Sequence, residues 1–256
     1  MKKFLLGAAG LVAAMGVATS AFAADLPARP YVKAPAMIAA IYDWSGFYVG
    51  LNAGGGSARK CWDINNNLGV AVAPAFREGC HDATGALAGG QIGFRWQSGE
   101  WVFGIEAQGD WANFKGQNAS LFPFVVPATN QTKVNGLGLL TGQVGYAWSN
   151  VLFYVKGGGA VASDRYRGLV TATNVFFDQA DENRWGGVVG AGIEVGFAPN
   201  WSVAFEYDHL FMGNRNIQMT NTATGALSRW DNIKQDVDLG QVRVNYRWGG
   251  PVIAKY

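Results

Sequence analysis

Hydrophobic and polar side chains alternate along most of the chain from residue 44 onward. In the stretch WSVAFEYDHLF, residues 201–211, the aromatic side chains of Phe205 and Tyr207 alternate with the carboxylates of Glu206 and Asp208. Successive side chains of a β-strand point to opposite faces, so this stretch predicts a strand with one aromatic and one acidic face.

Alternating stretches of this kind recur along the chain. Eight are predicted as strands, approximately at residues 44–57, 83–97, 100–114, 132–148, 151–167, 184–198, 200–215 and 234–248. Tight turns around Ser98-Gly99, Ser149-Asn150 and Pro199-Asn200 alternate with long connections at residues 58–82, 115–131, 168–183 and 216–233. An even strand number with short turns at one end and long loops at the other is typical of outer-membrane barrels. We therefore predict an all-β fold, an eight-stranded antiparallel up-and-down transmembrane β-barrel over residues 44–248, with short periplasmic turns and long extracellular loops.

The tryptophans are sorted toward the strand ends. Six lie next to a short turn or a terminal strand end, namely Trp44, Trp96, Trp101, Trp148, Trp201 and Trp248. Tryptophan prefers the membrane–water boundary, and membrane barrels carry aromatic girdles there. A soluble sandwich has no reason for this sorting, so we predict that these six form an interface girdle.

The charged residues of the strands share one phase of the alternation. With Phe205 and Tyr207 facing lipid, the opposite phase collects a set of charges that we predict to form a network in the lumen: Arg95, Glu106, Asp110, Lys156, Glu194, Glu206, Asp208, Arg243 and Arg247. On the lipid face an Arg or Lys near the midplane would cost ~2–4 kcal/mol, whereas inside an eight-stranded barrel charges can pair in a space that side chains fill. Solvated charges on one open sheet are the alternative. The phase is less clean near Asp236 and Asp238, where we expect a bulge or residues above the membrane.

Glycines interrupt several predicted strands, as in GLNAGGG, GGQIGF and KGGGA. Glycine normally weakens a strand, but in a small curved barrel it makes room for large interior side chains and for bending.

The N-terminus predicts export. Lys2 and Lys3 precede an uncharged run that closes on an A-x-A site at residues 21–23, which predicts a cleaved signal peptide over residues 1–23 rather than a retained anchor. Removing both lysines changes the net charge from +2 to 2 − 2 = 0, so nothing suggests a nucleic-acid surface. Residues 24–43, rich in proline and alanine, are predicted to be an extended periplasmic segment, and residues 249–256 a C-terminal tail.

The chain has two cysteines, Cys61 and Cys80. In an exported protein they are predicted to form a disulfide, in a region that the sequence marks as a loop. A metal site that also uses His81 is the alternative, but it has too few ligands for the usual zinc pattern.

Three stretches resemble a known family. The start ADLPARPYVKAP, the motif WSGFYVGLNAGGG and the ending VRVNYRWGGPVIAKY resemble the small outer-membrane β-barrel proteins of alphaproteobacteria, described as porin-family or surface-antigen proteins. The resemblance covers essentially the whole chain. It implies an outer-membrane barrel with periplasmic termini, and members have been described as surface antigens, envelope proteins, porins or hemin binders. The last strand also resembles a signal for the barrel-assembly machinery, with either Trp248 or Tyr256 as its terminal aromatic.

Catalytic and cofactor sites are not predicted. His209 shares the lipid-facing phase of Phe205, but the next position on that face is Phe211 rather than a serine, so no nucleophile accompanies it. Glu206 and Asp208 lie where structural ion pairs are expected. His81, His209, Met212 and Met219 are candidate hemin ligands near the outer face without a specific spacing.

The predicted role is therefore structural or surface-exposed, in a monomer surrounded by outer-membrane lipid and lipopolysaccharide. A porin-like channel for small solutes is the second hypothesis. A receptor, adhesin or hemin binder that works through the loops is the third.

Overall fold

The computed structural model describes residues 42–248, which belong to one compact unit. The predicted signal peptide, most of the segment at 24–43 and the tail at 249–256 lie outside the described residues. No helix among the described residues is long and apolar enough to span a membrane.

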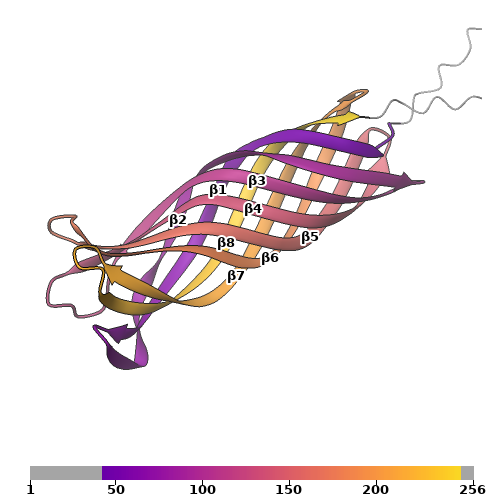
Figure 1. Cartoon of the computed structure of the whole chain (residues 1–256). Helices are drawn as coiled ribbons and strands as arrows, with labels where there is room; N and C mark the ends of the chain where they lie inside the picture. The colour runs from indigo at the N-terminus through magenta and orange to yellow at the C-terminus, as the bar shows by residue number, and fades with distance from the viewer. Residues whose placement is uncertain (1–41, 249–256) are drawn as a thin grey trace, which may run out of the picture. The chain divides into compact units, whose positions relative to one another are not determined.

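The described residues form a closed antiparallel barrel in which each strand pairs with its neighbours in sequence and β1 pairs with β8 (Figure 1). The strands are β1 (Gly46–Asn67), β2 (Val70–Ser98), β3 (Trp101–Ala119), β4 (Ala128–Trp148), β5 (Val151–Val170), β6 (Phe176–Ala198), β7 (Trp201–Asn221) and β8 (Leu227–Trp248). The predicted eight-stranded up-and-down barrel is confirmed.

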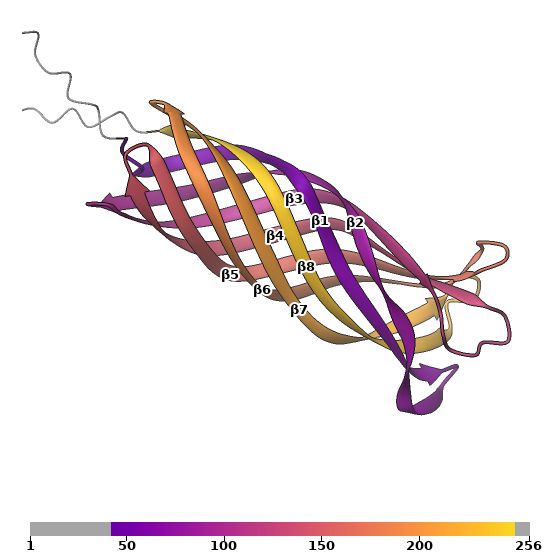
Figure 2. The same ribbon diagram turned by 180° about the vertical axis from the view of Figure 1, so that it is seen from behind.

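The two ends of the barrel differ. At one end, which we call the turn end, strands are joined by the short turns at residues 99–100, 149–150 and 199–200. At the other, the loop end, the connections are residues 68–69, 120–127, 171–175 and 222–226, and the tip of the β1–β2 hairpin stands away from the rest (Figures 1 and 2).

The four segments predicted as long loops are mostly strand, because the paired strands continue through most of their residues. The first of them is almost entirely a β-hairpin that turns at Leu68 and Gly69, both with positive φ. Toward the loop end most outward side chains are polar, so alternation of hydrophobic and polar residues no longer marks the strand. The backbone hydrogen bonds of the ladder continue nevertheless.

The outer wall carries an apolar belt next to the turn end. In β3 the outward positions run from Trp101 to Trp111 before the first polar one, Asn113, and in β1 they run from Phe47 to Gly55 before Ser57. These spans match the ~9–11 residues with which a tilted strand crosses a bilayer. The remainder of each strand therefore extends beyond the membrane as a polar-walled barrel.

Inward side chains form layers, which can be followed along β8. From the turn end, the buried positions are first polar, Arg243 and Gln241, then apolar, Leu239 and Val237, and finally charged again at Asp231. The suspected bulge near Asp236 and Asp238 does not lie in β8, whose burial alternates without a break there. It lies in β7 between Phe211 and Gly213. Both aspartates face outward above the apolar belt.

Candidate functional site

A buried arginine joins two carboxylates near the middle of the lumen. Arg243 of β8 bonds to Glu106 of β3 through one guanidinium nitrogen and to Glu206 of β7 through another. Each carboxylate also accepts a hydrogen bond from a tyrosine hydroxyl. Tyr48 donates to Glu106 and Tyr154 donates to Glu206, both at 2.6 Å. Charge-assisted bonds of this kind are stronger than neutral ones.

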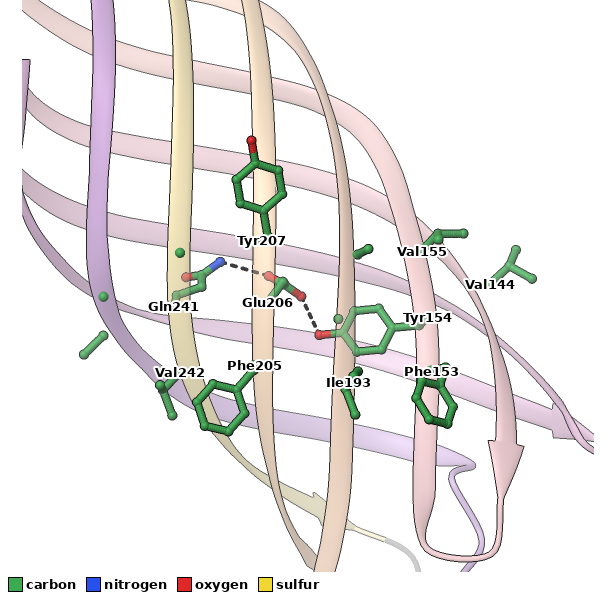
Figure 3. Close-up of a pocket in the computed structure, with 15 residues that line it drawn as sticks. Val144, Phe153, Tyr154, Val155, Ile193, Phe205, Glu206, Tyr207, Gln241 and Val242 are labelled. Atoms are coloured by element: carbon green, nitrogen blue, oxygen red, sulfur yellow. Dashed lines mark hydrogen bonds between the residues drawn. The ribbon is translucent and has the colours of Figure 1, made fainter. Parts of the chain in front are cut away.

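A lysine binds the same carboxylates from another wall. Nζ of Lys156 on β5 lies 2.7 Å from Oε1 of Glu206, 3.3 Å from Oδ1 of Asp208 and 3.6 Å from Oε1 of Glu106. The amide of Gln241 donates to Glu206 at 2.9 Å (Figure 3). It also donates to Asp208 at 2.9 Å. These side chains come from four strands, so the network ties the barrel wall together across its lumen.

A second ion pair lies nearer the turn end. Arg95 and Glu194 are 2.9 Å apart and both are buried. The Arg95 guanidinium lies 4.5 Å from the centre of the Tyr48 ring and 5.6 Å from that of Tyr154. This pair therefore packs against the tyrosines that bond the central carboxylates.

Two residues of the predicted network are inward but make no ion pair within the described part of the chain. Asp110 accepts a hydrogen bond from Gln108 at 2.8 Å. Arg247 donates to the carbonyl oxygens of Ser45 and Pro199 at 3.1 Å each, so it caps backbone at the turn end. The prediction that Arg247 is part of the charge network is wrong, because the carboxylates lie farther up the lumen.

Interior glycines make room for the two central tyrosines. Tyr48 is paired with Gly93 across β1 and β2, and Tyr154 with Gly192 across β5 and β6. A Cβ added at either glycine would lie 2.5 Å from the paired tyrosine ring. The two tyrosines were not predicted as site residues. For Tyr48 the signal was present, because Phe47 and Val49 face outward and the residue between them must then face inward.

We expect Gly192→Val to destabilise the barrel by about 1–3 kcal/mol, because the added methyls displace the Tyr154 ring from Glu206. Gly240→Val is the matched control, since a Cβ there meets no atom within 4 Å. The measurement is the urea midpoint of the loss of folded gel mobility in detergent. Equal midpoints for the two variants would contradict this role for Gly192.

An apolar layer crosses the lumen between the central network and the loop end. All eight strands contribute buried side chains to it, namely Ala58, Ala83, Leu87, Ala112, Phe114, Val134, Leu137, Leu139, Ala160, Ala162, Val188, Leu210, Met212, Val237 and Leu239. The Phe114 ring reaches β1, where a Cβ at Gly56 would be 2.6 Å from it. This layer was not predicted, because only charged side chains were assigned to the lumen.

Two further charge clusters lie beyond the apolar layer. In the first, Lys60 bonds to Asp164 at 2.9 Å and to Gln235. Neither cluster was predicted, because residues such as Lys60 and Arg229 lie in the segments 58–82 and 216–233, which the sequence marks as loops.

In the second cluster, Arg229 bonds to Glu78 and Asp178 at 2.9 Å and lies 3.3 Å from Asp231. Asn130 accepts a hydrogen bond from the same guanidinium at 2.9 Å. All five side chains are buried and come from β2, β4, β6 and β8. The cluster closes the loop end of the barrel.

Cys61 and Cys80 form a disulfide. They are not in a loop but face each other directly on β1 and β2, on the outer side of the extension. His81 points the other way, into the lumen, where its ring nitrogens contact Asn118 at 2.7 Å and Thr132 at 3.1 Å. The alternative metal site is therefore not assembled.

Five of the six predicted girdle tryptophans are exposed on the outer wall at the turn end: Trp96, Trp101, Trp148, Trp201 and Trp248. Trp44 is not. It is 1 % exposed and packs with Val102, Leu152 and Tyr154 inside the barrel. Trp44 precedes β1, so no strand alternation directs it outward, and it covers the turn end of the lumen together with Tyr42.

The candidate hemin ligands are not brought together. His209 lies on the outer wall, with Nδ1 2.7 Å from Oδ1 of Asp238. His81, Met212 and Met219 are buried in the lumen, and the two methionines belong to different clusters. Among the described residues no group of histidines, cysteines and carboxylates is suited to a metal ion.

A shallow hollow of about 780 Å³ lies on the apolar belt rather than in the lumen. Its lining is mostly outward side chains, including Phe153, Ile193, Phe205 and Val242 (Figure 3). This position exposes it to acyl chains, and it shares only the wall with the charge network.

A closed barrel with an apolar outer belt, aromatic girdle and ion-paired interior defines an integral membrane β-barrel protein. The model of the outer membrane protein beta-barrel domain matches residues 9–248, so the chain belongs to this family and lies in the outer membrane.

Two curated relatives of this chain are named as outer-membrane proteins. The 31 kDa outer-membrane immunogenic proteins of Brucella melitensis and Brucella suis are each 29 % identical over 232 residues, covering 85 % of this chain and 90 % of theirs. The crystal structure of the outer membrane protein OprG from Pseudomonas aeruginosa is similar with a TM-score of 0.49 and 10 % identity, covering 81 % of this chain and 100 % of that one.

Proposed function

We propose that this protein is a structural, surface-exposed barrel of the outer membrane whose lumen does not conduct. The apolar layer to which all eight strands contribute carries this proposal. An ion on its way through would have to shed its water among alanine, leucine and phenylalanine side chains, and dehydrating a charge in such surroundings is costly.

The networks on either side of this layer support the same role. Arg243, Lys156 and their carboxylates bond across the lumen and hold the wall together within the membrane. Arg229 and its partners do so at the loop end. Neither cluster is arranged as a nucleophile with a base, and we propose no catalytic residue.

The orientation is part of the proposal. Short turns of outer-membrane barrels face the periplasm, so we place the loop end outside the cell. The Brucella relatives are named as immunogenic outer-membrane proteins, and by likeness we propose that the loop end of this chain is exposed at the cell surface.

A loop-mediated receptor is the second candidate, and one observation favours it. The hairpin tip and the β3–β4 connection expose large apolar side chains to solvent, among them Leu68, Val70 and Val125. Such exposed groups are typical of contact surfaces when they gather in a patch.

The test of the closed lumen is conductance in planar bilayers. We expect no reproducible current steps from folded protein, with folding verified by a shift of gel mobility on boiling and a known porin as positive control. Reproducible steps from verified folded protein would show that ions pass the lumen, and the closed-lumen proposal would be wrong.

A further inference from the structure

Basic residues gather on one outer face of the barrel just above the apolar belt. Lys115 of β3 is paired with Lys133 of β4, and Lys133 with Arg165 of β5. Arg167 follows on the same face, and the four line an open pocket of about 270 Å³ together with Gln131 and Thr132. Neighbouring like charges repel, so an anion bound here would stabilise the arrangement.

The positive charge of this face is poorly neutralised. Within residues 42–248 only Arg165 of the four has a carboxylate within 4 Å, Asp181 at 2.6 Å. The outward faces of β3, β4 and β5 carry no Asp or Glu.

The opposite side of the barrel is balanced. There Arg59 is paired with Asp236 and Asp82 in the strand register, and Lys234 lies 3.7 Å from Asp236. Of these two faces, the β3–β5 face is therefore the one with an excess of positive charge.

The height of the cluster points to the membrane surface. On each strand the basic residue is the second polar outward position beyond the apolar belt: Lys115 follows Asn113, Lys133 follows Asn135, and Arg165 follows Ser163. Side chains at this height face the lipid headgroups laterally, below the tips of the loop-end connections.

The outer wall directly below the cluster has few protruding side chains. Outward glycines fill it, namely Gly109, Gly136, Gly138, Gly142, Gly157 and Gly159. An added Cβ at Gly109 or Gly159 would meet no atom within 4 Å, so barrel packing does not require glycine there. Leu140, strongly exposed, lies within this strip between Gly138 and Gly142, and Trp111 lies on β3 between Gly109 and Asn113.

We propose that the β3–β5 face binds an anionic glycolipid of the outer leaflet. Its headgroup phosphates contact Lys115, Lys133, Arg165 and Arg167, and its acyl chains lie along the glycine strip. Cations above an apolar strip match a lipid, because its charged headgroup lies above its acyl chains. A soluble anion would leave the strip unused. The inference rests on the proposed orientation, with the loop end outside, but not on whether the lumen conducts.

The test uses the folded full-length mature protein in detergent, titrated with diphosphoryl lipid A and followed by native mass spectrometry. Lys115→Gln combined with Lys133→Gln is expected to weaken retention of lipid A roughly thirtyfold, because each basic residue near an anionic lipid surface contributes about 1 kcal/mol and about 1.4 kcal/mol corresponds to a tenfold change in affinity. Lipid A without phosphates is expected to bind wild-type protein more weakly than the double variant binds the phosphorylated form, because it loses the contacts with all four basic residues.

Arg59→Gln combined with Lys234→Gln is the matched control. It removes the same charge at a similar height from the balanced side and is expected to leave retention unchanged. Equal losses of lipid A retention in the two double variants would show that only net charge matters, and this result would overturn the proposal. It would also be overturned if inorganic phosphate bound as tightly as lipid A. Neither readout involves conductance, and protease access to the loop end on whole cells tests the orientation separately.

Discussion

Replacing Arg243 by methionine is expected to lower the free energy of unfolding of the barrel by about 3–5 kcal/mol, since it leaves buried carboxylates without their cation. Glu106 and Glu206 both bond to this guanidinium, and only Lys156 would remain to neutralise them. The measurement is the urea midpoint of folded gel mobility after reconstitution in lipid.

Two controls separate the network from a general effect of charge. Arg243→Lys keeps the charge but loses the planar fork that contacts both carboxylates, so an intermediate loss is expected. Arg77→Gln breaks the exposed pair with Asp63 and is expected to change little. If Arg243→Met and Arg77→Gln had the same midpoint, the central network would not stabilise the barrel.

Replacing Arg229 by methionine is expected to open the loop end. Glu78, Asp178 and Asp231 would be left buried with no cation, at a cost of about 3–5 kcal/mol that falls on this end of the barrel. The Arg229 guanidinium also lies 5.5 Å from the ring of Phe124 in the β3–β4 connection. Faster proteolysis within residues 120–127 is the expected signal, with the membrane-embedded half still resistant.

Asp231→Asn is the matched variant at the same cluster, which lies beyond the apolar belt. Burial raises the pKa of Asp231, and the charges of Glu78 and Asp178 add to this rise against the effect of Arg229. The folded state then holds a proton that the unfolded state releases near pH ~4, so this group costs stability as pH rises above that value. We expect Asp231→Asn to resist proteolysis at least as well as wild type at pH 7. A loss as large as that of Arg229→Met would contradict this charge balance.

The membrane-embedded half of the barrel was predictable from the sequence because two constraints act there together. Lipid demands apolar side chains on one face, and the strand sends alternate side chains to opposite faces, so Phe205 outward implies Glu206 inward. The even strand number follows from antiparallel closure, in which β1 pairs with β8. The alternation also explains why the ion pairs of Lys156 and Arg243 fall within predicted strands.

Beyond the membrane that constraint is lost, and the sequence was misleading. Outward positions such as Arg59 and Lys115 are polar, so these strands resemble loops, and the cluster around Arg229 was missed with them. Trp44 was misplaced for a related reason. It precedes the first strand, so its direction depends on the closed end of the barrel rather than on local alternation.

The sequence by itself determined that this protein is an exported eight-stranded membrane barrel, because period-two alternation and turn spacing are local properties of the chain. Only the tertiary structure decided what fills the lumen. Partners such as Arg243 and Glu106 are far apart in sequence, and barrel closure and strand stagger bring them together. The same closure gathers single apolar residues from every strand into one layer across the lumen, which no individual strand shows.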